Sequence, residues 1–220
     1  MKKCIVLLVI SIFFMGILSA NVFATASFDK ELEATILKTK ELFDIKDTYD
    51  TFDSRVNSNG NKVHFYLNWS DSRNELDSIS ITTDSKGNII SYNKYGTEYK
   101  EPESKLPNYT RNEALKFAKE FIGKIDKEIY NGIELIESNN QLNSYDVEYN
   151  FTFDRVVNGI PYRDNTVSIN VNKFTGEINN FYTNWDRDII FPSANDIITL
   201  EDGRKAFIDK IGLDLMYKNS

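Results

Sequence analysis

Residues 149–161 read YNFTFDRVVNGIP, and this stretch decides the fold. From Tyr149 to Val157 every second residue is large and apolar, apart from an arginine at position 155, which is typical of a strand with one buried face. The next two residues are Asn158-Gly159, a dipeptide that favours a two-residue type I′ turn with positive φ at both positions. The stretch therefore predicts an antiparallel hairpin.

Arg155 shares a face of this strand with the phenylalanines. We expect it at the open end of the sheet, paired with an acid or with its stem packed on an aromatic ring. Pro161 cannot donate a hydrogen bond to a neighbouring strand, so it indicates a sheet edge or the frayed end of the hairpin. Such an edge could receive a partner, which makes Arg155, Asn158 and Gly159 the candidate binding residues.

The hairpin is part of a longer pattern of a helix followed by strands. An amphipathic helix is predicted at 110–125, where Thr110 and Glu113 have the spacing of a capping box. The periodicity then changes to two, and strands are predicted at 145–157, 166–172 and 178–185, with a turn at 173–177.

The preceding part of the chain repeats this scheme, with a helix at 27–43 and a hairpin turn at 84–88. Its strands are predicted at 63–69, 76–83 and 89–95, with a candidate strand before them at 48–55. Ile79-Ser80-Ile81 matches Val167-Ser168-Ile169. The sequence therefore predicts an α+β fold of tandem units, each one amphipathic helix packed on an antiparallel meander of three to four strands, and it leaves open whether the units stack or share a sheet.

The first residues resemble an export signal. Lys2 and Lys3, an apolar run to Leu18 and small residues before Ala24 predict a signal peptide at 1–24. The alternative is a retained membrane anchor, but the apolar run is shorter than the roughly 20 residues that span a bilayer. We expect a secreted or cell-wall-associated protein without an integral membrane span after cleavage.

The remaining chain divides into 25–100 for the first unit, 101–196 for the second and 197–220 for a third segment. In that segment Thr199 and Asp202 resemble another helix cap, and a strand-like alternation begins after Gly212. We expect either the start of an incomplete third unit or a C-terminal capping helix.

Composition excludes some partners. Cleavage after Ala24 would remove two lysines and no acid, so the net charge would change from −7 to −9. Nucleic acid and anionic lipid bind Lys and Arg, and no basic run is present, so neither is expected as a partner.

Catalytic and cofactor motifs are scarce. His64 is the single histidine and the single cysteine lies in the signal segment, so a Cys-His pair is excluded and His64 is interpreted as a half-covered strand residue. No enzyme activity, cofactor or metal is expected. Asp44, Asp47, Asp50 and Asp53 could hold Ca²⁺, but a solvated loop is favoured because the glycine of a tight calcium loop is missing.

Aromatic residues make up 13% of the chain and are frequent in the predicted strands. Exposed on a sheet face, such rings could stack on sugars or hold a peptide, whereas buried rings would belong to the core. The core interpretation is favoured.

The stretch from Tyr149 to Pro161, the Thr175-Gly176 turn and an aromatic strand ending in Trp185 resemble the YcdB/YcdC repeated domain of Gram-positive cell-envelope proteins, which is similar to PepSY modules. The resemblance implies a secreted, non-catalytic module that binds or restrains an extracellular peptidase or another protein. The alternative is a cell-wall-associated module that binds glycan or acts as a spacer. Residues 27–96 match more loosely because they lack the Arg-x-x-Asn-Gly phrase.

Overall fold

The computed structural model describes residues 28–60, 62–96, 106–136, 146–194 and 198–212. The predicted signal peptide and the strand-like alternation after Gly212 lie outside them. The first group of elements is α2 (Asp29–Leu42), β1 (Thr51–Asn59), β2 (Lys62–Asp71), β3 (Asn74–Asp84) and β4 (Ile89–Tyr95). The second group is α3 (Arg111–Ile125), α4 (Lys127–Asn131), β5 (Ile133–Leu135), β6 (Glu148–Val157), β7 (Ile160–Asn172) and β8 (Ile178–Asn184), followed by α5 (Leu200–Lys210).

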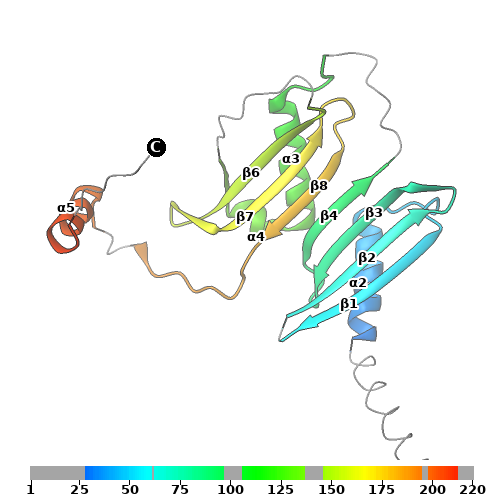
Figure 1. The fold of residues 1–220 in the computed structure, drawn as a ribbon, viewed down its shortest axis with the longest axis horizontal. Helices are drawn as coiled ribbons and strands as arrows, with labels where there is room; N and C mark the ends of the chain where they lie inside the picture. The colour runs from blue at the N-terminus through cyan, green and yellow to red at the C-terminus, as the bar shows by residue number, and fades with distance from the viewer. Residues whose placement is uncertain (1–27, 61, 97–105, 137–145, 195–197, 213–220) are drawn as a thin grey trace, which may run out of the picture.

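All eight strands form one antiparallel sheet in the order β1-β2-β3-β4-β8-β7-β6-β5 (Figure 1). The two groups meet where β4 pairs with β8, over only three residue pairs centred on Tyr92↔Phe181. The two predicted meanders therefore share a sheet and do not stack. This confirms the predicted α+β class, and we refer to the two groups as the N-terminal half and the C-terminal half.

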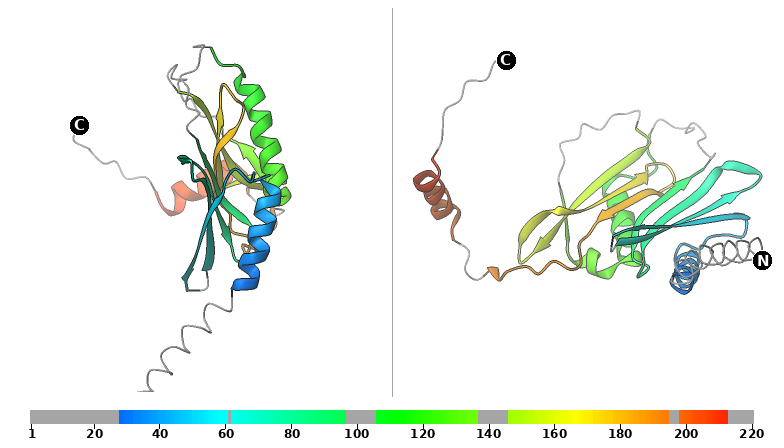
Figure 2. Two further views of the ribbon diagram at one scale, coloured as in Figure 1. Left: turned by 90° about the vertical axis from the view of Figure 1, so that its right-hand side faces the viewer. Right: turned by 60° about the horizontal axis from the view of Figure 1, so that its bottom comes forward.

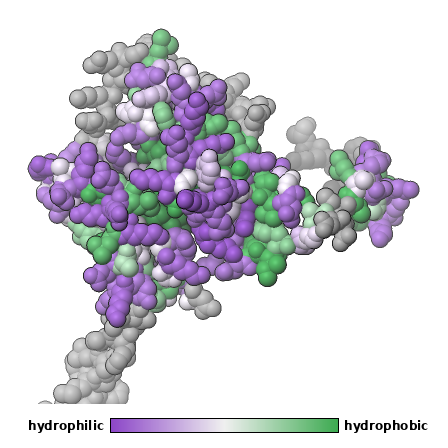
Figure 3. Space-filling model, turned by 180° about the vertical axis from the view of Figure 1, so that it is seen from behind, coloured by the Kyte–Doolittle hydropathy of each residue, from purple (hydrophilic) through white to green (hydrophobic). Residues whose placement is uncertain are grey.

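Helices α2 and α3 cover the same face of the sheet, roughly in line with each other (Figure 2). Four aromatic rings join the halves beneath them, since Phe43 stacks on Tyr92, and Phe121 contacts Phe43, Tyr92 and Phe181. Tyr92 and Phe181 are buried, so one continuous core extends under both helices. Seen from the helix side, hydrophilic residues cover most of the surface and hydrophobic ones show between them (Figure 3).

Corresponding turns pack against corresponding helices. Gly87 and Gly176 both have φ of 74°. A Cβ atom on Gly87 would lie 3.4 Å from Thr35 of α2, and one on Gly176 would lie 3.1 Å from Phe117 of α3. Each glycine therefore provides the left-handed turn and also lets a helix approach it closely.

The helix caps follow the sequence pattern. The Thr110 hydroxyl accepts from the Glu113 N–H and the Glu113 carboxylate accepts from the Thr110 N–H, which confirms the predicted capping box of α3. Thr199 caps α5 in the same way through the Asp202 N–H, but α5 buries none of its residues and stands clear of the sheet (Figure 1). None of the helices in the described ranges is long and apolar enough to cross a membrane.

Two short elements were not predicted, α4 and β5. Strand β5 pairs with β6 at Arg155, Asp154 and Phe153, and the N–H of Val156 donates to Gly132 just before β5. The hairpin strand that carries Arg155 is therefore an interior strand, so the first of the two expectations, a sheet edge, is wrong; Pro161 lies near the tip of the hairpin, opposite Val156. The correction arises because three residues of β5 are too few to show a periodicity.

Candidate functional site

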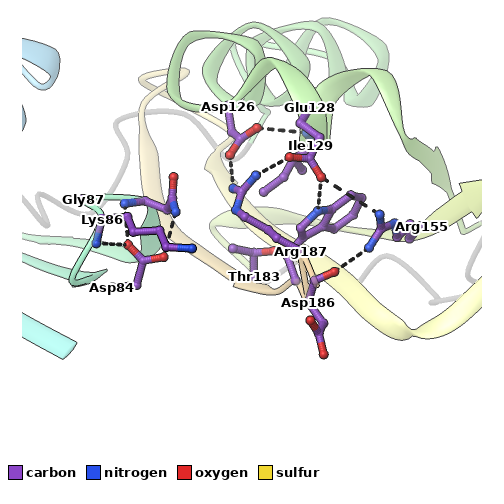
Figure 4. A network of polar contacts seen from close by, with 12 residues as sticks. Asp84, Lys86, Gly87, Asp126, Glu128, Ile129, Arg155, Thr183, Asp186 and Arg187 are labelled. Carbon is purple, nitrogen blue, oxygen red and sulfur yellow. Dashed lines mark hydrogen bonds and ion pairs between the residues drawn. The ribbon is translucent and has the colours of Figure 1, made fainter. Parts of the chain in front are cut away.

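The predicted site residue Arg155 is held in a cluster at the end of the sheet, shown in Figure 4. Its guanidinium lies 4.5 Å from the ring centroid of Trp185 and 4.8 Å from that of Phe191. It donates to the Asn165 side chain at 2.9 Å and to the Asp186 carbonyl at 2.7 Å. With a side chain only 12% exposed, Arg155 packs on rings as the sequence predicted, and it has little surface left for a partner.

A second arginine extends this cluster to helix α4. Arg187 pairs with Asp126, which also caps α4, and with Glu128 at 2.5 Å. Glu128 accepts from the Trp185 indole at 3.0 Å. Burial opposes the charge, but the two carboxylates raise the pKa of Arg187 above its usual range. The cluster of Asp126, Glu128, Arg155, Trp185 and Arg187 thus fastens α4 to the ends of β6 and β8.

Asn158 and Gly159 form the exposed tip of the hairpin. Their φ angles are 54° and 77°, and Val157 pairs with Ile160, as the type I′ prediction requires. A bulge between Asp154 and Arg155 lies between this tip and the main part of the sheet. The structure therefore separates Arg155, which is packed inside the cluster, from the two turn residues, which are exposed.

A concave feature lies where the halves meet. Beyond Ser91↔Tyr182 the strands β4 and β8 part, and a hollow of about 680 Å³ opens between them. Tyr66, Thr82, Ser91 and Tyr182 line it from the sheet. We call it the junction hollow.

Three titratable residues that line the junction hollow have identifiable surroundings. His64 lines it and is half-buried on β2, as predicted. Asp84 accepts from the backbone N–H groups of Lys86 and Asn88, so its carboxylate holds a turn (Figure 4). Arg187 is engaged by the cluster.

Three of the four aspartates considered for Ca²⁺ make separate contacts, Asp47 and Asp50 before β1 and Asp53 within it. Asp47 lies 3.4 Å from Lys40, Asp53 lies 3.4 Å from Arg55, and Asp50 accepts from the Ser72 N–H and hydroxyl. The Ser72 bonds lower the pKa of Asp50. Among the described residues no group of three or more His, Cys, Asp or Glu side chains is placed to hold a metal ion.

The sheet face opposite the helices carries two rows of polar side chains that sequence reasoning missed, and both rows are uncharged except at the edge strand β1. Their members alternate along each strand with buried residues such as Leu67 and Phe181. The hydroxyl row consists of Arg55, Tyr66, Thr82, Ser91, Tyr182, Ser168 and Thr152, paired in that order across the sheet. The amide row consists of Asp53, Asn68, Ser80, Asn93, Asn180, Asn170 and Asn150.

Alternation along each strand was the available signal for these rows, but their continuity depends on the register across β4 and β8. Of the aromatic residues in the predicted strands, Trp69, Tyr92, Tyr149 and Phe181 are buried, as the core interpretation expects, whereas Tyr95 is 57% exposed. Tyr66 and Tyr182 are 42% and 49% exposed and belong to the hydroxyl row. Tyr145 lies outside the described residues.

Comparisons with known proteins agree with this fold. The solved Bacillus megaterium YpeB C-terminal domain is similar at a TM-score of 0.51 and 16% identity, over 79% of this chain and 72% of that one. No curated protein matches. The family model of the YcdB, YcdC repeated domain matches residues 32–185. The resemblance seen in the sequence is thereby confirmed, and the chain belongs to the YcdB/YcdC repeated-domain family, with a PepSY-like α+β fold.

Proposed function

We propose that this chain is a secreted, non-catalytic PepSY-like module that binds an extracellular peptidase or another protein by adding a strand of the partner to β1. The observation that carries the proposal is the free edge of the sheet. Strand β1 is the first in the sheet order, nine residues long and exposed along almost its whole length. An edge of this kind offers a row of N–H and C=O groups to an extended peptide.

The hydrogen-bond pattern identifies which groups face outward. The hairpin from β1 to β2 closes on Asn59↔Lys62, with two residues between them. A closing pair of this kind exchanges hydrogen bonds across the hairpin, and pairs with and without such bonds alternate from there. The N–H groups of Ser54, Val56 and Ser58 therefore face away from β2.

The opposite edge is less suited to strand addition. Strand β5 has three residues, and Arg155 and Val156 of the strand beside it are already engaged by Ile133 and Gly132. The sequence suggested that a partner could bind near Arg155, but the backbone groups there already bond to other residues of the chain. Strand β1 offers backbone groups that do not bond to β2.

Ser54→Pro tests the proposal because it removes one outward N–H near the middle of β1 and spares the bonds to β2. Ser54→Ala is the matched control, since it keeps the N–H. The measurement is the affinity of the chain without residues 1–24 for purified secreted peptidases, together with inhibition of their activity. Wild type and Ser54→Ala should bind alike, and Ser54→Pro should bind about tenfold more weakly, the loss of roughly one hydrogen bond.

Equal binding by Ser54→Pro and Ser54→Ala would contradict strand addition at β1. Absence of binding to any secreted peptidase, combined with retention on purified peptidoglycan, would contradict the protein-binding function. That outcome would favour the alternative, a wall-associated module, which the uncharged rows of the open face also support.

A further inference from the structure

We propose that the open face of the sheet binds an uncharged glycan strand, with Tyr66 and Tyr182 as the platforms on which sugar rings stack. The site comprises the hydroxyl row, the amide row and the junction hollow that adjoins them. It is independent of strand addition at β1, because it uses side chains on the face of the sheet and not the backbone of its edge.

The first argument is charge. Charged residues make up 27% of the chain, yet the only charged members of the two seven-residue rows are Arg55 and Asp53, both on the edge strand β1. The twelve interior positions carry hydroxyl groups, amides and two phenols. The junction hollow adds Lys62, Lys86 and Arg187 together with Asp84, Asp186 and Asp188, so its basic and acidic side chains balance. A face that bound a polyanion or a basic peptide would need charges of opposite sign, so this one suits a partner without charge.

The second argument is the preorganisation of the polar groups. Ser80 donates to Asn68 at 2.7 Å, Asn180 donates to Asn93 at 2.5 Å, and Asn170 donates to Glu148 at 3.0 Å. An amide has two donor hydrogens and an acceptor oxygen with two lone pairs, so each of these bonds fixes a side chain and leaves it further bonding capacity. Sugar hydroxyl and acetamido groups need such mixed donors and acceptors.

The third argument is the placement of the exposed rings. Tyr66 and Tyr182 are the aromatic members of the hydroxyl row, and Thr82 and Ser91 lie between them. Three strand spacings separate the two tyrosines, roughly 14 Å. A trisaccharide spans this length, and all four side chains line the junction hollow. Rings at both ends with hydroxyl groups between them match the alternation of apolar faces and polar edges in a sugar chain.

The helices leave this face free. Both α2 and α3 lie on the other side of the sheet (Figure 2), and Figure 1 looks onto the open face. The acidic net charge of the chain disfavours anionic wall polymers, which leaves the neutral glycan as the wall component with fitting chemistry.

Binding of a tetramer of β-1,4-linked N-acetylglucosamine, followed by calorimetry at low and high salt, tests the proposal. Wild type should bind saturably with little dependence on salt, because no ion pair forms. Tyr182→Ala should bind about tenfold more weakly, whereas Tyr182→Phe, which keeps the ring, should bind as wild type does. Tyr130→Ala, which removes a 45% exposed tyrosine from α4, should bind normally, as should Ser54→Pro.

Three results would overturn the proposal. The first is the absence of saturable binding by wild type, and the second is unchanged affinity in a Tyr182→Ala variant whose circular dichroism shows it folded. The third is a concentration-dependent dimer in sedimentation that Tyr182→Ala abolishes while no glycan binds, because this would assign the face to a second copy of the chain.

Discussion

The two halves of the sheet share one architecture but are held together differently. In the N-terminal half, α2 buries only Thr35 and Thr39 and lacks a side-chain cap at its start. In the C-terminal half, α3 buries Ala114, Ala118 and Ile122 and has a complete capping box. The apolar side chains of α2 that pack on the core, such as Leu32 and Ile36, are only partly buried. A helix that buries apolar side chains completely contributes more to stability, so the C-terminal half holds the larger share of the core.

The outer edges of the halves differ in the same direction. Among the described residues β1 is exposed and pairs on one side only, whereas β5 covers Phe153–Arg155 of β6, and Arg155 and Arg187 fasten α4. The comparison indicates that Arg155, whose Arg-x-x-Asn-Gly phrase the N-terminal half lacks, helps to close one edge. The half without it keeps the edge that we propose for binding.

The largest expected effect comes from the helix anchors. Ile122→Ala should lower the free energy of unfolding by about 3 to 4 kcal/mol, because Ile122 is completely buried. Ile36 of α2 is partly buried, so Ile36→Ala should lower the free energy of unfolding by less than half as much. Urea denaturation of both variants measures the difference, and equal losses would contradict the unequal halves.

The pH dependence of stability tests the contact between the halves, because Tyr92 lies at the centre of the β4–β8 pairing. Burial first, and then the charge of Glu177, raise the pKa of its phenol to about 12. Because the folded pKa lies above the ordinary value of 10.0, the neutral phenol stabilises the fold below pH 10, and this contribution of roughly 3 kcal/mol is lost as pH rises toward 12.

Tyr92→Phe cannot ionise, so its stability should decline less than that of wild type over this range. A residual decline is expected because burial, and then hydrogen bonding to Asp77, also raise the pKa of Tyr49. Denaturation curves at several alkaline pH values measure both declines. Identical declines in the two proteins would contradict the burial of the Tyr92 phenol between the halves.

Arg155→Ala should have a smaller effect, about 2 kcal/mol, from the loss of its ring contacts and two hydrogen bonds. The matched change in the other half is Arg55→Ala. The Arg55 side chain is 82% exposed, so this substitution should lower the free energy of unfolding by less than about 0.5 kcal/mol. The melting temperature of Arg155→Ala should change more than any binding affinity. An unchanged melting point with lost affinity would instead make Arg155 a binding residue.

Local features of the fold were predictable from the sequence. The Asn158-Gly159 turn and the Thr110–Glu113 capping box depend on residues close in sequence, and both form as expected. The ring contact of Arg155 followed from its position on the core face of its strand. Pairing with an acid was the other expectation, but the identity of the acid was not predicted, because Glu128 lies in α4, a helix of five residues.

The arrangement of the halves depends on contacts that a single sequence does not display. Three residue pairs join β4 to β8, and neither strand carries a signal for the other. The two uncharged rows could not be predicted for the same reason. Alternation within a strand assigns a side chain to one face, but only the register between distant strands places Ser91 beside Tyr182. The sequence indicated that exposed rings could stack on sugars, but only the structure shows that Tyr66 and Tyr182 are exposed and lie in one row.

Native-state hydrogen exchange tests the contrast between a closed and an open half most directly. Amides of Ser54, Val56 and Ser58, which face away from β2, should exchange fastest within the sheet. Amides of β6 and β7, such as Phe153 and Ile169, should exchange only on global unfolding, since both residues are completely buried. Protection of the outward β1 amides equal to that of β6 would contradict the account, because it would show that the N-terminal edge is closed as well.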